Sequence, residues 1–198
     1  MTKQVLFIQG GGDGVHDAWD DKLVASLGTA LGPDYAIRYP RMPNEADPRY
    51  VPWKAALEQE LGALGPGAIV VGHSIGATIL VHVLAEGQPG RALAGLFLIA
   101  TPFIGEGGWP SQEIEPRLDL GARLPPGMPI FLYHGSEDET APLAHVELYA
   151  KAIPQAHVRR LKGRDHQLNI DLAIVADDIR QLGWAAGNAS GTVACGLE

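Results

Sequence analysis

The sequence contains one cysteine, few basic residues and no long apolar run. The single cysteine, Cys195, excludes an intrachain disulfide in a chain of 198 residues, a composition typical of a reducing compartment. Lys and Arg number 15 against 23 Asp and Glu, which gives a formal net charge of −8. A surface of that sign repels phosphate backbones, so we expect no nucleic-acid partner.

The apolar segments are too short or too interrupted for a secretory signal or a membrane span. The first strand-like run, residues 5–8, has only four apolar residues, fewer than a signal peptide needs. Polar residues such as His73 and Ser74 interrupt the apolar stretch 68–85, which excludes it as a membrane span. We therefore expect a cytoplasmic protein without a membrane partner.

Short apolar segments alternate with longer segments of helical periodicity. Hydrophobic residues make up 46% of the chain and charged residues 19%, as in ordinary globular domains. The pattern predicts strands at 5–8, 35–39, 68–72, 93–100, 129–134 and 156–161, and helices at 17–31, 50–64, 75–85, 143–153 and 168–182. This alternation is typical of a parallel sheet covered on both faces. The expected fold class is α/β, a three-layer sandwich with a mostly or wholly parallel sheet of six strands.

One domain is expected over residues 1–184, followed by a flexible tail at 185–198 that is rich in Gly, Ala and Ser.

In the helix predicted at 17–31, Trp19, Leu23 and Leu27 fall near one apolar face. The Gly- and Pro-rich segment 101–126, with a helical patch near 114–120, is too short for a domain and suits a small lid or loop.

The clearest chemical signal is the G-x-S-x-G pattern at residues 72–76. An apolar strand leads directly into Ser74 and an apolar helix leaves from it. This context is typical of a sharp strand-to-helix turn that exposes a nucleophilic serine. Gly72 and Gly76 remove side chains that would collide in such a turn. An incidental serine in a glycine-rich loop is the alternative, and the flanking strand and helix favour the nucleophile.

A serine nucleophile needs a histidine base, which should follow it after the last strand. His166 stands in the loop between the last predicted strand and the closing helix, so it is the predicted base. The alternatives after Ser74 lie inside predicted helices or at strand ends, namely His82, His134, His145 and His157.

The carboxylate that orients the histidine should follow the penultimate strand. The turn after residues 129–134 offers Glu137, Asp138 and Glu139. Asp138 is the predicted acid because the turn would present it toward the histidine loop. Any one of these carboxylates could instead be a turn or capping residue.

Stabilising an oxyanion requires backbone N–H donors close to the serine. We expect one donor from Ile75 and the other from the loop after the first strand, with Gly11 favoured and Gly10 next. A phosphate-binding loop is the alternative use of these glycines, but Asp13 and the register of the glycines argue against it. The histidines show no recognised metal-ligand spacing, so neither a metal nor a cofactor is expected.

With these residues in place, the sequence resembles the α/β-hydrolase superfamily over about residues 4–183. Within it, the chain is most similar to the small serine hydrolases related to the retinoblastoma-binding hydrolase. The shared motifs are the Gly-Gly-Gly-Asp loop at 10–13, Met42-Pro43, Trp53 and the Gly-His-Ser turn at 72–74. The resemblance implies Ser74, Asp138 and His166 as a catalytic triad, and a sheet without the two leading antiparallel strands of larger hydrolases. Gln167 departs from the family, which often has an aromatic residue after the base.

The expected activity is that of a carboxylesterase acting on a small-molecule acyl substrate, a small or short-chain ester. Phe103, Ile104 and Trp109 are candidates to line its pocket, or else plain packing residues. Three alternatives stay open: an amide or peptide hydrolase with the same residues, an acyltransferase, and a fold retained as a protein-interaction module. The sequence leaves the oligomeric state undetermined.

Overall fold

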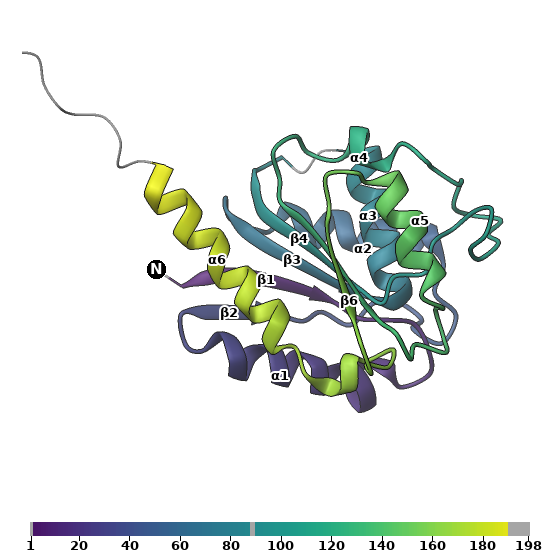
Figure 1. The fold of residues 1–198 in the computed structure, drawn as a ribbon, viewed down its shortest axis with the longest axis horizontal. Helices are drawn as coiled ribbons and strands as arrows, with labels where there is room; N and C mark the ends of the chain where they lie inside the picture. Colours follow the sequence, from purple (N-terminus) through teal and green to yellow (C-terminus); the bar gives the residue numbers. More distant parts are fainter. Residues whose placement is uncertain (1, 88–89, 190–198) are drawn as a thin grey trace, which may run out of the picture.

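Strands and helices alternate along the chain, as the computed structural model shows for residues 2–87 and 90–189 (Figure 1). The strands are β1 (Lys3–Ile8), β2 (Tyr35–Arg38), β3 (Ala68–His73), β4 (Leu93–Ile99), β5 (Ile130–Gly135) and β6 (His157–Leu161). The helical elements are η1 (His16–Asp20), α1 (Asp21–Leu31), α2 (Tyr50–Gly62), α3 (Ser74–Glu86), α4 (Leu120–Arg123), α5 (Ala144–Ala152), η2 (Leu168–Ile170) and α6 (Ala173–Ala189).

The six strands form one sheet in the order β2-β1-β3-β4-β5-β6, and every neighbouring pair is parallel. The predicted fold class is therefore confirmed, with the sheet wholly parallel. From β1 the chain first moves outward to β2, then returns past β1 to β3 and continues in the opposite direction. This reversal opens a crevice beyond the carboxyl ends of β1 and β3, the position where open α/β sheets bind ligands.

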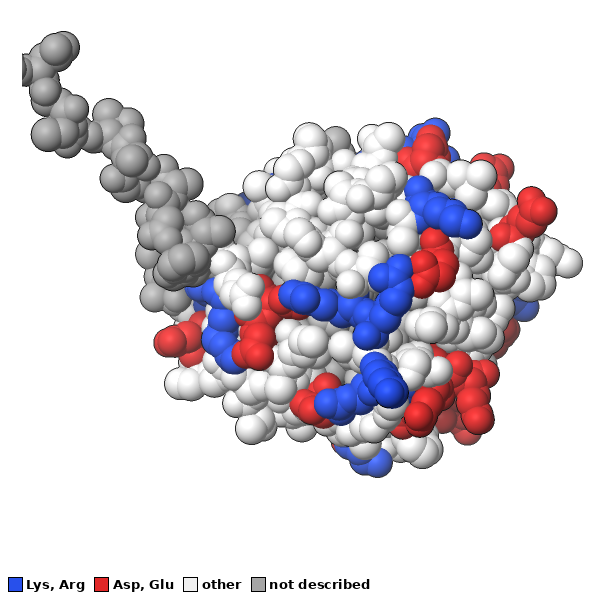
Figure 2. All heavy atoms as spheres, viewed as in Figure 1, with Lys and Arg blue, Asp and Glu red and all other residues white. Residues whose placement is uncertain are grey.

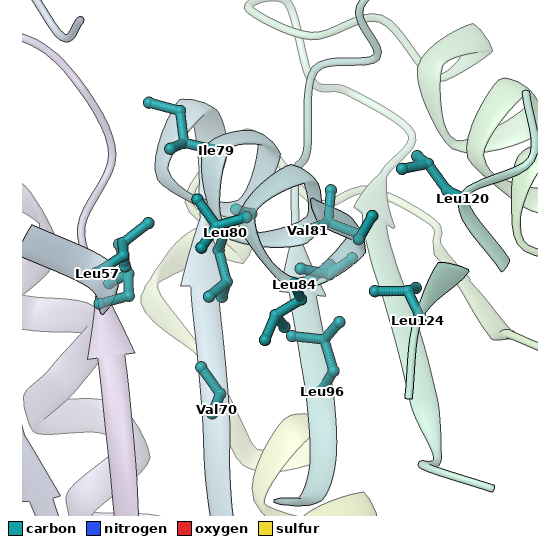
Figure 3. Packing of buried hydrophobic residues seen from close by; sticks show 14 of the residues in the cluster. Leu57, Val70, Ile79, Leu80, Val81, Leu84, Leu96, Leu120 and Leu124 are labelled. Atoms are coloured by element: carbon teal, nitrogen blue, oxygen red, sulfur yellow. The ribbon is translucent and has the colours of Figure 1, made fainter. Parts of the chain in front are cut away.

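Alternate residues of each strand point to opposite faces, so the sheet separates two apolar cores. In β1, Val5 and Phe7 pack with helices α1 and α6, whereas Leu6 and Ile8 belong to the core beneath α2, α3 and α5. Helices on both faces account for the three layers seen in Figure 1. In the core beneath α2, α3 and α5, leucines of α3 lie over the strands (Figure 3). Because both faces are covered, the central strands are almost continuously apolar.

The first predicted helix begins differently from the prediction. Residues 16–20 form a π-helical turn before α1 begins at Asp21. A π turn takes more residues than an α turn, so it shifts the phase of the side chains that precede α1. Trp19 is consequently 51% exposed, while Asp20 is fully buried. The prediction that Trp19 lies on the buried face is wrong.

The last helix also begins later than predicted. Residues 168–170 form a short 3₁₀ turn with left-handed backbone at Asn169, and α6 begins at Ala173. The Asp165 carboxylate accepts hydrogen bonds from the N–H groups of Gln167 and Asn169, which competes with helix formation at this point. The tail predicted from residue 185 begins inside α6, and residues 190–198 lie outside the described residues.

The segment between β4 and β5 contains α4, placed after the helical patch predicted near 114–120. A single bridge between Ile104 and Trp109 closes a small loop there.

Charged side chains of both signs lie next to one another on the face that carries α5 and α6 (Figure 2). Arg159 pairs with Asp178, Arg160 with Glu147, and Arg164 with Asp171. These arginines are therefore largely neutralised by neighbouring carboxylates. Among the helices of the described residues, none has the length and apolarity needed to cross a membrane.

The turn between β3 and α3 packs directly against the chain that leaves β1. A Cβ added to Gly76 would stand 1.9 Å from the carbonyl oxygen of Gln9, and one added to Gly72 would stand 2.8 Å from Cα of Ala77. Real Cβ atoms do not approach backbone atoms this closely. Both positions therefore require glycine for close approach rather than for an unusual φ.

We predict that Gly76→Ala lowers the free energy of unfolding by at least about 1–3 kcal/mol, because the added methyl must displace backbone of the β1 loop. At this chain length that corresponds to roughly 2–4 °C in Tm for each kcal/mol. Gly62→Ala is the matched control, since a Cβ there meets nothing within 4 Å. It should leave Tm unchanged or raise it slightly. Equal Tm values for the two variants in thermal unfolding would contradict the close approach.

Candidate active site

Four strands of the sheet deliver chemically active groups to one edge. β1 leads to the glycines at 10–12, β3 to Ser74, β5 to Asp138 and β6 to His166. All four strands are parallel, so their carboxyl ends meet at the same edge of the sheet. Ser74 and the glycine loop lie on either side of the crevice between β1 and β3. Topology thus gathers residues that are far apart in the chain, since Ser74 and His166 alone are 92 positions apart.

Ser74 stands at the first position of α3 with φ +52°, a left-handed conformation that costs an L residue about 1–2 kcal/mol. The preceding residue, His73, is still extended at φ −113° and ψ 140°. The chain therefore turns sharply within one residue. Strain of this kind persists only where the surrounding packing holds it, and the close contacts of Gly72 and Gly76 provide that packing.

Ser74, His166 and Asp138 form a continuous hydrogen-bonded chain. The Ser74 hydroxyl lies 2.9 Å from Nε2 of His166, and Nδ1 of His166 lies 2.8 Å from Oδ2 of Asp138. The three residues are each less than 9% exposed. The arrangement leaves the imidazole proton on Nδ1, facing the carboxylate, and Nε2 free to accept the serine proton.

The Asp138 carboxylate is held from its other side by the backbone. Oδ1 accepts hydrogen bonds from the N–H groups of Thr140, at 2.9 Å, and Ala141, at 2.8 Å. Burial would raise the pKa of Asp138, but the bonds from His166 and from the Ala141 N–H outweigh burial and lower that pKa below its usual value. Asp138 is therefore an ionised acceptor at neutral pH. Of the three carboxylates considered for this turn, it is the one that reaches the histidine.

Burial of the imidazole lowers the pKa of His166 below its ordinary value of 6.5. The neighbouring rings of His73 and His134 act in the same direction, while Asp138 opposes them. His166 is consequently neutral at neutral pH. A neutral imidazole is the form that can take a proton from the serine.

The loop after β1 lies against the first turn of α3. A Cβ on Gly11 would stand 2.8 Å from Cγ2 of Ile75, so the two segments are in contact. The N–H of Ile75 belongs to the first turn of α3, where N–H groups have no partner within the helix. Within the described part of the chain, the Gly11 N–H also has no acceptor. These two groups are free to bind a developing oxyanion.

Gly10 differs from the expectation. Its N–H donates a 2.6 Å hydrogen bond to Oδ2 of Asp20. The donor is therefore already used, and Gly10 supports the loop rather than supplying a free N–H. The sequence showed the glycine but not the buried carboxylate facing it.

Gln9 and Glu45 anchor the same loop to the segment that follows β2. Oε1 of Gln9 accepts the Met42 N–H at 2.9 Å, and its Nε2 donates to Oε2 of Glu45 at 2.6 Å. The Glu45 carbonyl accepts the Gly12 N–H at 2.6 Å. The Met-Pro segment noted in the sequence thus supports the glycine loop.

A cavity of about 550 Å³ opens over Ser74 and His166. Apolar side chains line much of it, among them Val15, Trp19, Pro48, Ile75 and Trp109.

The three residues expected from the sequence to line the pocket lie in three different environments. Trp109 lines the cavity over Ser74. Ile104 borders a neighbouring hollow of about 270 Å³, which shares Ile75 and Trp109 with the first. Phe103 is 1% exposed and packs edge-to-face on Tyr149, so it belongs to the core.

Asp20 and His73 are the residues near the site that sequence reasoning missed. Both are buried, and Oδ2 of Asp20 lies 2.9 Å from Nδ1 of His73. A signal for Asp20 was present, because it precedes Leu23 and Leu27 at helical spacing and places a carboxylate on the apolar face. His73 was visible as the residue before the serine, without a partner to suggest its role.

Three further histidines, His82, His134 and His145, are buried within the structure. Burial lowers the pKa of His82 in α3 to about 4, so it is neutral. His134 contacts the Ala141 carbonyl at 2.6 Å, and Nδ1 of His145 accepts the Phe103 N–H at 2.7 Å. Over the described residues, no cluster of three or more His, Cys, Asp or Glu side chains is arranged to hold a metal ion.

Comparison with known proteins agrees with this architecture. Residues 5–187 match the model of the alpha/beta hydrolase family. The chain is similar in structure to the ydeN gene product from B. subtilis, with 21% identity, a TM-score of 0.69 and coverage of 92% of this chain and 99% of that one. It is also similar to the esterase domain of a Rhodothermus marinus protein, with 19% identity, a TM-score of 0.65 and coverage of 92% and 86%. A third similar structure comes from work on carboxylesterases of Nitrososphaera gargenis, with 15% identity, a TM-score of 0.61 and coverage of 96% and 92%.

At sequence identities of 15–21%, the similarity to these three structures shows a shared fold. A search of curated proteins finds no match. The family match extends over nearly all of the described chain. The chain belongs to the α/β-hydrolase family.

Proposed function

We propose that this chain is a serine hydrolase that cleaves small or short-chain carboxylic esters through an acyl-serine intermediate. The observation that carries the proposal is the placement of His166 between two partners, with Nε2 at 2.9 Å from the Ser74 hydroxyl and Nδ1 at 2.8 Å from Asp138. A buried imidazole held in this way serves as the base for a serine nucleophile.

In the first half of the reaction, Oγ of Ser74 attacks the ester carbonyl while its proton passes to Nε2 of His166. The Asp138 carboxylate stabilises the resulting imidazolium, and the N–H groups of Gly11 and Ile75 stabilise the oxyanion. When the tetrahedral intermediate collapses, the bond to the alcohol breaks and His166 returns the proton to the leaving oxygen. Water then repeats the sequence on the acyl-serine and releases the acid.

The size and lining of the cavity support a small ester. A volume of about 550 Å³ lies within the range of small-molecule sites. Apolar side chains such as Trp19 and Trp109 suit the hydrocarbon parts of an ester better than a charged substrate. The segment 101–126 carries only a four-residue helix and is too short to form a large lid over a long lipid.

Within the α/β-hydrolase family, we group the chain with the small hydrolases related to the retinoblastoma-binding hydrolase. The Gly-Gly-Gly-Asp loop, the Met-Pro segment and Trp53 in α2 support this grouping. The esterase and carboxylesterase descriptions of two similar structures favour ester over amide cleavage. A panel of p-nitrophenyl esters and aminoacyl amides distinguishes these substrate classes.

Labelling with a fluorophosphonate tests the proposed nucleophile. Wild type should react, while Ser74→Ala and His166→Ala should not, because the first lacks the attacking oxygen and the second lacks the base. Esterase activity of each variant should fall by about 10⁴-fold or more. Ser111→Ala is the control, since that exposed hydroxyl accepts hydrogen bonds only from nearby backbone N–H groups in the described chain. Undiminished labelling of Ser74→Ala contradicts the assignment.

The pH dependence of kcat/KM tests the base. The reaction needs neutral His166, whose pKa is lowered by burial. The rate should therefore rise with pH along an acid limb centred below 6.5 and reach a plateau above it. A limb centred above 6.5, measured with a neutral ester, would show that a different group controls the reaction.

A further inference from the structure

A second buried acid–histidine pair lies directly beside the proposed triad. Asp20 is fully buried and His73 is 2% exposed. Nδ1 of His73 lies 2.9 Å from Oδ2 of Asp20, and Nε2 of His73 lies 3.1 Å from the carbonyl oxygen of His166. Neither residue takes part in the proton transfers described above. They nevertheless contact the glycine loop and His166, and His73 directly precedes Ser74 in the chain.

The partners of His73 bear on its protonation state. A carbonyl oxygen carries no proton, so Nε2 of His73 must donate to His166. On the other side, Oδ2 of Asp20 already accepts the Gly10 N–H. If Asp20 is ionised, Nδ1 must donate as well, and a histidine that donates from both nitrogens is an imidazolium. A proton on Oδ1 of Asp20 would find no acceptor in the described chain, and a proton on Oδ2 would make the oxygen that accepts the 2.6 Å Gly10 bond donate to Nδ1 of a neutral His73.

The charges around the pair favour the ionised form. Burial opposes both charges, but the attraction and hydrogen bond between them prevail, so the pKa of Asp20 is lowered and that of His73 is raised. Asp138 adds a further attraction to His73 from beyond His166. Buried charges are tolerated when they are paired and hydrogen-bonded in this way.

The pair joins three segments that arrive from different strands. Asp20 holds the Gly10 N–H, next to the proposed oxyanion donor Gly11. His73 holds the backbone of His166, whose ring centroid lies 5.0 Å from its own. His73 also directly precedes Ser74 in the chain. Loss of the pair would therefore loosen the nucleophile, the base and the oxyanion loop together.

We propose that Asp20 and His73 form a buried carboxylate–imidazolium pair that positions Ser74, His166 and the Gly11 N–H relative to one another and keeps His166 neutral. Its catalytic consequences rest on the proposed function, whereas its charge state does not. The cation beside His166 favours the neutral base before attack. After attack it makes the His166 imidazolium a stronger acid, which helps return the proton to the leaving alcohol.

The charge state is tested by ¹⁵N NMR of histidine-labelled full-length protein, with His73 assigned by comparison with His73→Gln. Both ring nitrogens of His73 should give protonated-type signals at neutral pH. An unprotonated nitrogen in His73 overturns the proposal. Recording the same spectra on Ser74→Ala keeps this result independent of hydrolase activity, so failure of the proposed function and failure of the pair are separate outcomes.

The positioning role is tested through the acid limb of kcat/KM. His73→Gln keeps a donor near the His166 carbonyl but removes the positive charge, so the limb should move upward by about one pH unit. Asp20→Asn can keep the Gly10 bond through its amide oxygen but offers His73 no negative charge, and it should move the limb in the same direction by less, because both charges disappear.

His157→Gln is the matched control, since His157 is exposed at the start of β6 and should leave the limb in place. A merely structural role would lower the rate and Tm without moving the limb. A limb unchanged in both His73→Gln and Asp20→Asn overturns the proposal even if the rates fall.

Discussion

The close contact between the turn at Ser74 and the chain leaving β1 is the constraint on which the site depends. Only a residue without a side chain fits at Gly76, where a Cβ would stand 1.9 Å from the Gln9 carbonyl. That contact holds Ser74 in its left-handed conformation and brings the glycine loop beside the first turn of α3. His166 is bonded to Ser74 in this turn, and Asp138 is bonded in turn to His166.

His166 is the point at which these bonds meet. Its side chain links Ser74 to Asp138, while its carbonyl oxygen is held by His73. His166 is thus restrained through both its ring and its backbone. All of these groups are buried, where electrostatic interactions are less screened than in water, so a small displacement of one affects its neighbours. This dense packing explains how the described residues bring the whole arrangement together at one edge of the sheet.

Much of the fold was predictable because its signals are local. Apolar runs separated by helical periodicity indicated a parallel sheet, and parallel strands bring their carboxyl ends together wherever they lie in the sequence. The order of Ser74, Asp138 and His166 along the chain could therefore be matched to loops at one edge. The structure brings these three side chains into contact, and among the described residues the N–H groups of Gly11 and Ile75 have no acceptor.

The rest depended on tertiary contacts that the sequence does not display. The π turn before α1 leaves Trp19 exposed at the cavity, while the carboxylate of Asp20 is buried beneath the glycine loop. That buried carboxylate then takes the Gly10 N–H. Phe103 lies in the core because the segment after β4 folds back on α5, a long-range arrangement without a periodic signal. Side-chain bonds from Asp165 similarly displace the start of the last helix.

Rapid acid quench during turnover of p-nitrophenyl acetate tests most directly whether Ser74 is acylated during ester cleavage. Mass spectrometry of the quenched protein should find one acetyl group per chain, on the peptide that contains Ser74, together with a matching burst of p-nitrophenol. Acetylation at another residue, or turnover by Ser74→Ala at the wild-type rate, would contradict the account.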